Sequence, residues 1–182
     1  ARVGAGLGVL SVAAGAKVLT RCRQRLPAHE DRGRHPVCEG EAGTQLEDAL
    51  QSYRWMLDRG VSPSQMFVAG DSAGGHLVLS LLLSLRDARL PMPAAAVAMS
   101  PWVDPGNSGA SMHANEAFDW MTKDMADLLG HWAGSGGGHD HPLFRLSGAD
   151  LSALPPTLIQ YGQAELCRDM IDELRVRQAS AS

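Results

Sequence analysis

The sequence predicts an α/β fold in which a mostly parallel sheet is flanked by helices on both faces. Short apolar runs of strand length alternate with longer segments of helical periodicity along the 182 residues. No turn dipeptide such as Asn-Gly joins two neighbouring strands, which favours parallel strands connected through helices. An apolar content of 45% is enough for one domain with its own buried core.

The individual elements follow from local patterns. Residues 7–14 are expected to be the small-residue end of a helix, which Gly15 would cap. Residues 21–43 carry prolines, glycines and several arginines without a period, so we expect an irregular basic loop. The other expected elements are strands at 17–20, 66–69, 94–99 and 157–161, helices at 46–57, 77–85, 122–133 and 167–177, and a glycine-rich loop at 134–141.

Charge and cysteine content argue against several classes of protein. Sixteen basic and twenty acidic side chains give a formal net charge of −4, which is a poor match for nucleic-acid phosphates. The three cysteines, Cys22, Cys38 and Cys167, fit neither a disulfide framework nor a zinc site, and they favour a reducing, cytoplasmic compartment. The apolar stretch 3–16 is shorter than the ~18 residues of a membrane span, so no transmembrane helix is expected. The first residue, Ala1, is typical of a processed product or a fragment.

The sharpest motif is Gly70-Asp71-Ser72-Ala73-Gly74, which lies between an apolar strand and a long apolar helix. It fits the nucleophile-elbow pattern Gly-x-Ser-x-Gly, in which the serine stands on a strained turn above the carboxyl edge of the sheet. Glycines two residues to either side allow the backbone to pass close to itself. The amide of Ala73, at the start of the following helix, can donate to a developing oxyanion. The motif therefore predicts Ser72 as a nucleophile and Ala73 as an oxyanion-hole donor.

The elbow and its flanks resemble the hormone-sensitive-lipase family of α/β-hydrolases, the α/β-hydrolase fold-3 type. The similarity covers roughly residues 15–174. The segments that carry it are the elbow at 70–75, Leu46-Glu47-Asp48-Ala49-Leu50 with Tyr53-Arg54-Trp55, Ser100-Pro101-Trp102-Val103-Asp104, and the approach to a later strand at 150–160.

The resemblance implies a hydrolase of small apolar carboxylic esters that needs no metal and no organic cofactor. In this family a serine attacks the ester, a histidine takes its proton and a carboxylate orients the histidine. The match puts Glu165 at the carboxylate position, after the strand at 157–161. Asp169 is the alternative acid, although the dipole of a helix N-terminus also explains an aspartate there.

Two parts of the family's machinery are missing from the sequence. Nothing resembles the His-Gly-Gly segment whose amides build most of the oxyanion hole. The chain ends 17 residues after Glu165, before the strand that carries the family's histidine. We therefore expect residues 1–182 to form a single, incomplete α/β-hydrolase domain that is weak or inactive as an esterase on its own. Residues 32–43 match no part of the family's pattern, as divergent sequence or a frame or splice artefact would.

The remaining histidines do not complete a triad. His113 is the substitute base that we consider, because it lies where the family places pocket or lid residues. His76 follows Ser72 by four residues in the elbow helix and is expected to pack or cap rather than to act as a base. His139 and His141 stand in a glycine-rich loop and are expected to be solvated, so no metal site is predicted.

Residues 104–132 are expected to line the substrate pocket. They include Met112, Phe118, Trp120 and Met121, which would form either an apolar pocket or part of the core.

Other functions also fit parts of this sequence. A non-catalytic relative would keep the pocket and bind a small ligand, as the plant gibberellin receptors do while lacking the histidine. A structural or interaction protein with a decayed fold is a third reading. Peptidases and thioesterases share the elbow, but the segments 100–102 and 154–156 favour the esterase family. The oligomeric state is not predicted.

Overall fold

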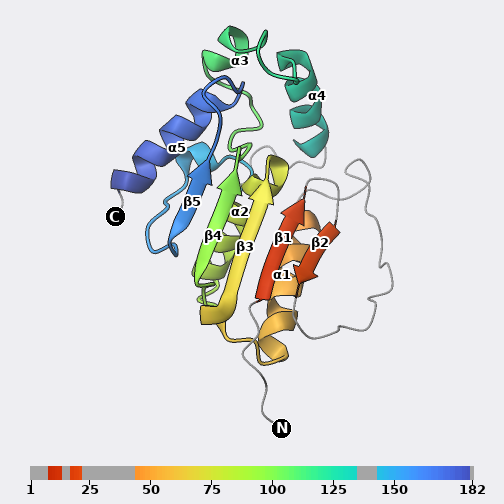
Figure 1. The fold of residues 1–182 in the computed structure, drawn as a ribbon, viewed down its shortest axis with the longest axis vertical. Coiled ribbons are helices and arrows are strands. Elements are labelled where there is room, and N and C mark those ends of the chain that lie inside the picture. Colours follow the sequence, from red (N-terminus) through yellow and green to blue (C-terminus); the bar gives the residue numbers. More distant parts are fainter. Residues whose placement is uncertain (1–7, 14–16, 22–43, 135–142, 181–182) are drawn as a thin grey trace.

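The computed structural model describes residues 8–13, 17–21, 44–134 and 143–180. Its centre is a five-stranded sheet with the order β2-β1-β3-β4-β5 (Figure 1). The strands are β1 (Gly8–Ala13), β2 (Lys17–Arg21), β3 (Met66–Asp71), β4 (Ala95–Met99) and β5 (Thr157–Gln160). The helices are α1 (Thr44–Asp58), α2 (Ala73–Asp87), α3 (Ser111–Ala114), α4 (Lys123–Gly134) and α5 (Arg168–Ser180), with short 3₁₀ turns η1 (Pro63–Gln65) and η3 (Leu146–Gly148). β1, β3, β4 and β5 run parallel, which confirms the predicted fold class.

The amino-terminal strands differ from the prediction. Residues 8–13 form β1 rather than the end of a helix, and β1 pairs antiparallel with β2 although no hairpin dipeptide marks the connection. The reason is tertiary, because β1 lies between two partners: Leu10 is opposite Val68 of β3 and Thr20 of β2. Ladders on both sides and the β-branched residues Val9 and Val12 favour a strand in a run that is too short for its periodicity to decide.

The other strands and long helices confirm their sequence patterns. β2 confirms the strand expected at 17–20, and α2 begins at Ala73, directly after the elbow serine. α3 and the two 3₁₀ turns were not predicted, since pieces of three or four residues have no readable period. Of the expected basic loop, Arg21 belongs to β2 and residues 22–43 lie outside the described residues. Of the expected glycine-rich loop, Gly134 ends α4 and residues 135–141 lie outside them as well.

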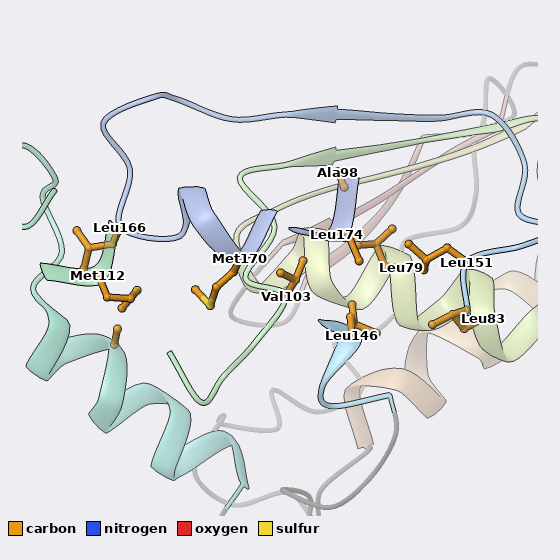
Figure 2. Close-up of a cluster of buried hydrophobic side chains, with 11 residues drawn as sticks. Leu79, Leu83, Ala98, Val103, Met112, Leu146, Leu151, Leu166, Met170 and Leu174 are labelled. Atoms are coloured by element: carbon orange, nitrogen blue, oxygen red, sulfur yellow. The ribbon is translucent and has the colours of Figure 1, made fainter. Parts of the chain in front are cut away.

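The helices α1, α2 and α5 flank one face of the sheet, whereas α3 and α4 lie beyond the carboxyl ends of the strands (Figure 1). Alternate strand side chains, including Val68, Ala96 and Ala98, point into two buried clusters on that face. α2 supplies both clusters, one shared with α1 and the other with α5. In Figure 2, α2 and α5 lie on the same side of the strands, with Leu79 of α2 near Leu174 of α5.

The opposite face of β3, β4 and β5 contains no fully buried side chain. Met99 and Leu158 on this face are 37% and 59% exposed. For the described residues, the expectation of helices on both faces is therefore wrong. Apolar runs of four to six residues look alike whether a strand is buried on one face or on two, so the sequence could not separate the two cases.

Candidate active site

Ser72 lies at the junction of β3 and α2 with φ 55° and ψ −119°. A positive φ is rare for a residue other than glycine and carries strain of about 1–3 kcal/mol. The chain turns so sharply here that a Cβ on Gly70 would lie 2.2 Å from the carbonyl oxygen of Gly74. Glycine at position 70 therefore allows the close approach on which the turn depends.

The segment after β4 binds the elbow on both sides of its serine. The amide of Ser72 donates to the carbonyl oxygen of Met99 at 2.9 Å, and the amide of Trp102 donates to the carbonyl oxygen of Ser72 at 3.1 Å. Pro101 packs over the elbow so closely that a Cβ on Gly75 would lie 3.0 Å from it. These contacts hold Ser72, which is half-buried, at the carboxyl edge of the sheet.

Ala73 is the first residue of α2. An amide at this position has no acceptor one turn earlier in its own helix. The positive end of the helix dipole also lies here. The Ala73 amide is therefore suited to an anionic oxygen, which is the role that the sequence predicts for it.

Glu165 lies in the loop after β5 and is half-buried. Its Oε1 atom accepts hydrogen bonds from the Ser100 hydroxyl at 2.8 Å and from the Gly162 amide at 2.7 Å. The backbone carbonyl of Glu165 accepts a further bond from the Asn115 side chain at 2.8 Å. Both the carboxylate and the loop that carries it are thus held in a defined orientation.

Asp169, the alternative acid, is engaged elsewhere. Its carboxylate accepts hydrogen bonds from the Arg168 guanidinium and from the amide of Ser111, both at 2.8 Å. The bond from Arg168, followed by the bond from Ser111, lowers the pKa of the Asp169 carboxyl. This aspartate joins the first turn of α5 to α3.

His76 packs as the sequence predicts. Its Nδ1 and Nε2 atoms lie 3.0 Å from the carbonyl oxygens of Trp102 and Leu143 respectively. Burial lowers the pKa of His76, against smaller opposing effects of the two carbonyls. The neutral ring carries one N–H and so donates to only one of these oxygens.

His113 is exposed on α3. The hydroxyl of Ser111, two residues earlier, is buried and donates to the carbonyl oxygen of Leu166. Two residues correspond to about 200° around a helix, so His113 faces away from the acid-bearing loop. The pKa of the Asp127 carboxyl is lowered chiefly by the hydrogen bond from Lys123, and the charge of His113 makes a smaller contribution in the same direction.

Among the described residues, the structure therefore brings no histidine into hydrogen-bonding contact with Ser72 or Glu165. His131 is exposed on α4, and His139 and His141 lie outside the described ranges. In the part of the chain that is described, no group of three or more His, Cys, Asp or Glu side chains could hold a metal ion. No helix there is both long and apolar enough to cross a membrane.

The expected pocket residues divide between core and surface. Met112 is fully buried, and Met121 packs against the same cluster. Phe118 and Trp120 are 75% and 79% exposed. Within the described structure, the methionines therefore belong to the core and the two aromatic side chains to the surface.

Sequence reasoning missed Ser100 and Asn115. Both form hydrogen bonds with Glu165, although Ser100 lies 65 residues and Asn115 lies 50 residues before it in the sequence. The one available signal for Ser100 was its place just after β4, at the same edge of the sheet as the elbow.

Comparisons with known proteins find relatives of this chain in sequence and in fold. A family model described as alpha/beta hydrolase fold matches residues 37–181. An acetyl-hydrolase from Streptomyces hygroscopicus is 39% identical over 162 residues, which are 88% of this chain and 50% of the relative. The carboxylesterase/phospholipase LipF from Mycobacterium tuberculosis is 35% identical over 133 residues, which are 68% of this chain and 35% of that protein.

Solved structures agree with the sequence comparisons. The crystal structure of an esterase from the bacterial hormone-sensitive lipase (HSL) family matches with a TM-score of 0.75 and 36% identity, over 79% of this chain and 48% of that chain. This chain thus spans about half the length of the acetyl-hydrolase and of the esterase.

Proposed function

Because this chain belongs to the hormone-sensitive-lipase type of the α/β-hydrolase fold family, whose members hydrolyse carboxylic esters, we propose that it carries the nucleophile and the acid of a serine esterase. The observation that carries the proposal is the elbow, with Ser72 at φ 55° on the turn from β3 into α2. Ester hydrolysis is a property of the family, and the roles of individual residues are the proposal.

In the proposed reaction, the Ser72 hydroxyl oxygen attacks the carbonyl carbon of the ester while a base removes the hydroxyl proton. The oxyanion that forms accepts a hydrogen bond from the Ala73 amide. The protonated base gives its proton to the leaving alcohol, and an acyl-serine remains. Water, activated by the same base, then releases the acid and restores Ser72.

Glu165 is proposed to orient and stabilise the base. Support comes from its place after β5 and from the two hydrogen bonds that fix its Oε1 atom. Asp169 is the weaker candidate, since Arg168 and Ser111 already occupy its carboxylate.

The base itself is unassigned among the described residues, because His76 is held by carbonyl groups and His113 is exposed. We therefore propose that the 182-residue chain hydrolyses esters slowly. Enzymes that lack one triad member retain about 10³–10⁴-fold catalysis over water.

Short, apolar acyl esters are the proposed substrates. The name of the acetyl-hydrolase relative supports a small acyl group. No nucleic acid enters the proposal, since the net charge of −4 gives no support for binding phosphates.

Hydrolysis of p-nitrophenyl acetate and butyrate tests this function. Added imidazole supplies an external base, and the hydrolysis that imidazole causes without protein is measured at the same concentration and subtracted from every sample. We expect slow turnover by the wild-type chain, faster turnover with imidazole, and neither in Ser72→Ala. The matched control is Ser64→Ala, which removes an exposed hydroxyl of η1 and should behave as the wild type.

Equal rates in Ser72→Ala and wild type would contradict the proposal. A rise in melting temperature with an ester or its acid product, without turnover, would instead favour a non-catalytic ligand-binding relative. The observation that favours this second function is that no base is assigned among the described residues.

A further inference from the structure

The two donors to Glu165 converge on one oxygen atom. The Ser100 hydroxyl and the Gly162 amide both bind Oε1, at 2.8 Å and 2.7 Å. Among the described residues, these hydrogen bonds leave Oε2 as the oxygen with lone pairs free to accept another donor. A carboxylate held through one oxygen presents the other in a fixed direction.

Strand pairing explains why Ser100 reaches the carboxylate. Met99 is opposite Gln160 in the β4–β5 ladder, so the residues that follow these two strands emerge side by side. The amide of Ser100 donates to the carbonyl oxygen of Gln160 at 2.6 Å, one step beyond that pair. Ser100 also has a φ of +41°, a conformation that is rare outside glycine and is often retained at functional sites.

The residue before Ser100, Met99, contacts the elbow. The carbonyl oxygen of Met99 accepts the amide of Ser72 at 2.9 Å. Adjacent residues at the end of β4 therefore contact both proposed catalytic residues, Met99 through its backbone and Ser100 through its side chain.

We propose that Ser100 is a positioning residue, which holds Oε1 of Glu165 so that Oε2 is presented to the base. This inference rests on the proposed function, because it assigns Ser100 a part in that reaction. Ser100 itself contacts neither substrate nor the reacting atoms, and it acts only through Glu165.

Two substitutions separate the hydroxyl from the backbone of Ser100. Ser100→Gly removes the hydroxyl but favours a positive φ, whereas Ser100→Ala removes the hydroxyl and keeps the Cβ. A purely structural role for this turn would be preserved in Ser100→Gly. The positioning role would be lost in both variants.

The readout is the backbone amide of Gly162 in ¹⁵N–¹H spectra of the full 182-residue chain, together with its hydrogen-exchange rate. We expect both variants to move the Gly162 resonance and to speed its exchange several-fold, because the carboxylate is free to turn away. Ser64→Ala should leave both unchanged. In a Glu165→Gln background, Ser100→Gly should have a much smaller effect on Gly162, since the charged acceptor is already lost.

An unchanged Gly162 amide in both Ser100 variants would overturn the inference, since Gly162 would then hold the carboxylate without Ser100. An equal effect of Ser100→Gly with and without Glu165 would overturn it as well. Failure of the proposed function is read separately, from the absence of Ser72-dependent hydrolysis in the same samples.

Discussion

At the scale of single residues, the site depends on backbone positions that few residue types can occupy. Ser72 carries strain at φ 55°, and Gly70 allows the turn to close against Gly74. The position of the Ser72 hydroxyl therefore depends on the glycine that allows this turn.

Gly70→Ala tests this dependence. The added methyl group would meet backbone at 2.2 Å, and backbone cannot move aside as a flexible side chain can. We expect the free energy of unfolding to fall by about 1–3 kcal/mol or more, measured by urea denaturation. The control is Gly148→Ala, where a Cβ meets nothing within 4 Å and the change should stay within about 0.5 kcal/mol. Similar midpoints for the two variants would show that the turn has room to relax.

His76 predicts a pH dependence of stability. Its folded pKa lies below the ordinary value of 6.5, chiefly through burial, so the folded state prefers the neutral ring. The resulting stabilisation is complete above the unfolded pKa and is lost as the pH falls through the lower folded pKa. Between about pH 7.5 and about pH 5.5, the wild type should lose more unfolding free energy than His76→Gln.

His131→Gln is the matched control for this experiment, because His131 is exposed on α4. It should retain the pH dependence of the wild type. Parallel curves for His76→Gln and the wild type would mean that burial of His76 does not govern its protonation.

At the scale of elements, α2 is the centre of the described structure. It begins at the elbow and supplies leucines to both buried clusters, so it connects α1 on one side with α5 on the other. The orientation of Ser72 therefore depends on packing along the whole helix.

Leu82→Ala should show how strongly this helix is anchored. Leu82 is fully buried in the cluster shared with α1. We expect a loss of about 2–5 kcal/mol in the free energy of unfolding, from lost burial and the cavity left behind. Leu128→Ala on α4, where the side chain is 47% exposed, should cost about 0.5 kcal/mol or less. A small effect at Leu82 would indicate that the cluster collapses to fill the space.

Elements with a clear local signal were predictable from the sequence, and long-range contacts were not. The elbow was readable because its glycines, its strand and its helix are contiguous. The strand β1 was not predicted because a six-residue, mostly apolar run is compatible with a helix or a strand, and its partners in the sheet decide between them. The contact between Ser100 and Glu165 depends on the β4–β5 register, which no local pattern reveals.

At the scale of the whole molecule, the sheet is unevenly covered. The helices α1, α2 and α5 pack on one face, whereas Leu158 of β5 is 59% exposed on the other. In the described sheet β5 is also an edge strand, paired only with β4 (Figure 1). An apolar edge strand invites pairing with another chain.

Leu158→Lys tests whether this surface drives self-association. A lysine on an edge strand opposes strand pairing between molecules. We expect light scattering to show less association at a given concentration, with the free energy of unfolding changed by no more than about 0.5 kcal/mol. Unchanged association would mean that another surface drives self-association, for example the one at Phe118 and Trp120.

Ser72 is proposed to be the nucleophile of an elbow that is already formed in this chain. Intact-mass spectrometry before and after treatment with a fluorophosphonate probe tests it most directly, since attack by the serine oxygen on phosphorus expels fluoride and leaves a stable adduct. We expect one slowly formed adduct per wild-type chain, faster labelling with imidazole, and no adduct on Ser72→Ala. A wild-type chain that remains unlabelled even with imidazole, or an equal adduct on Ser72→Ala, would contradict it.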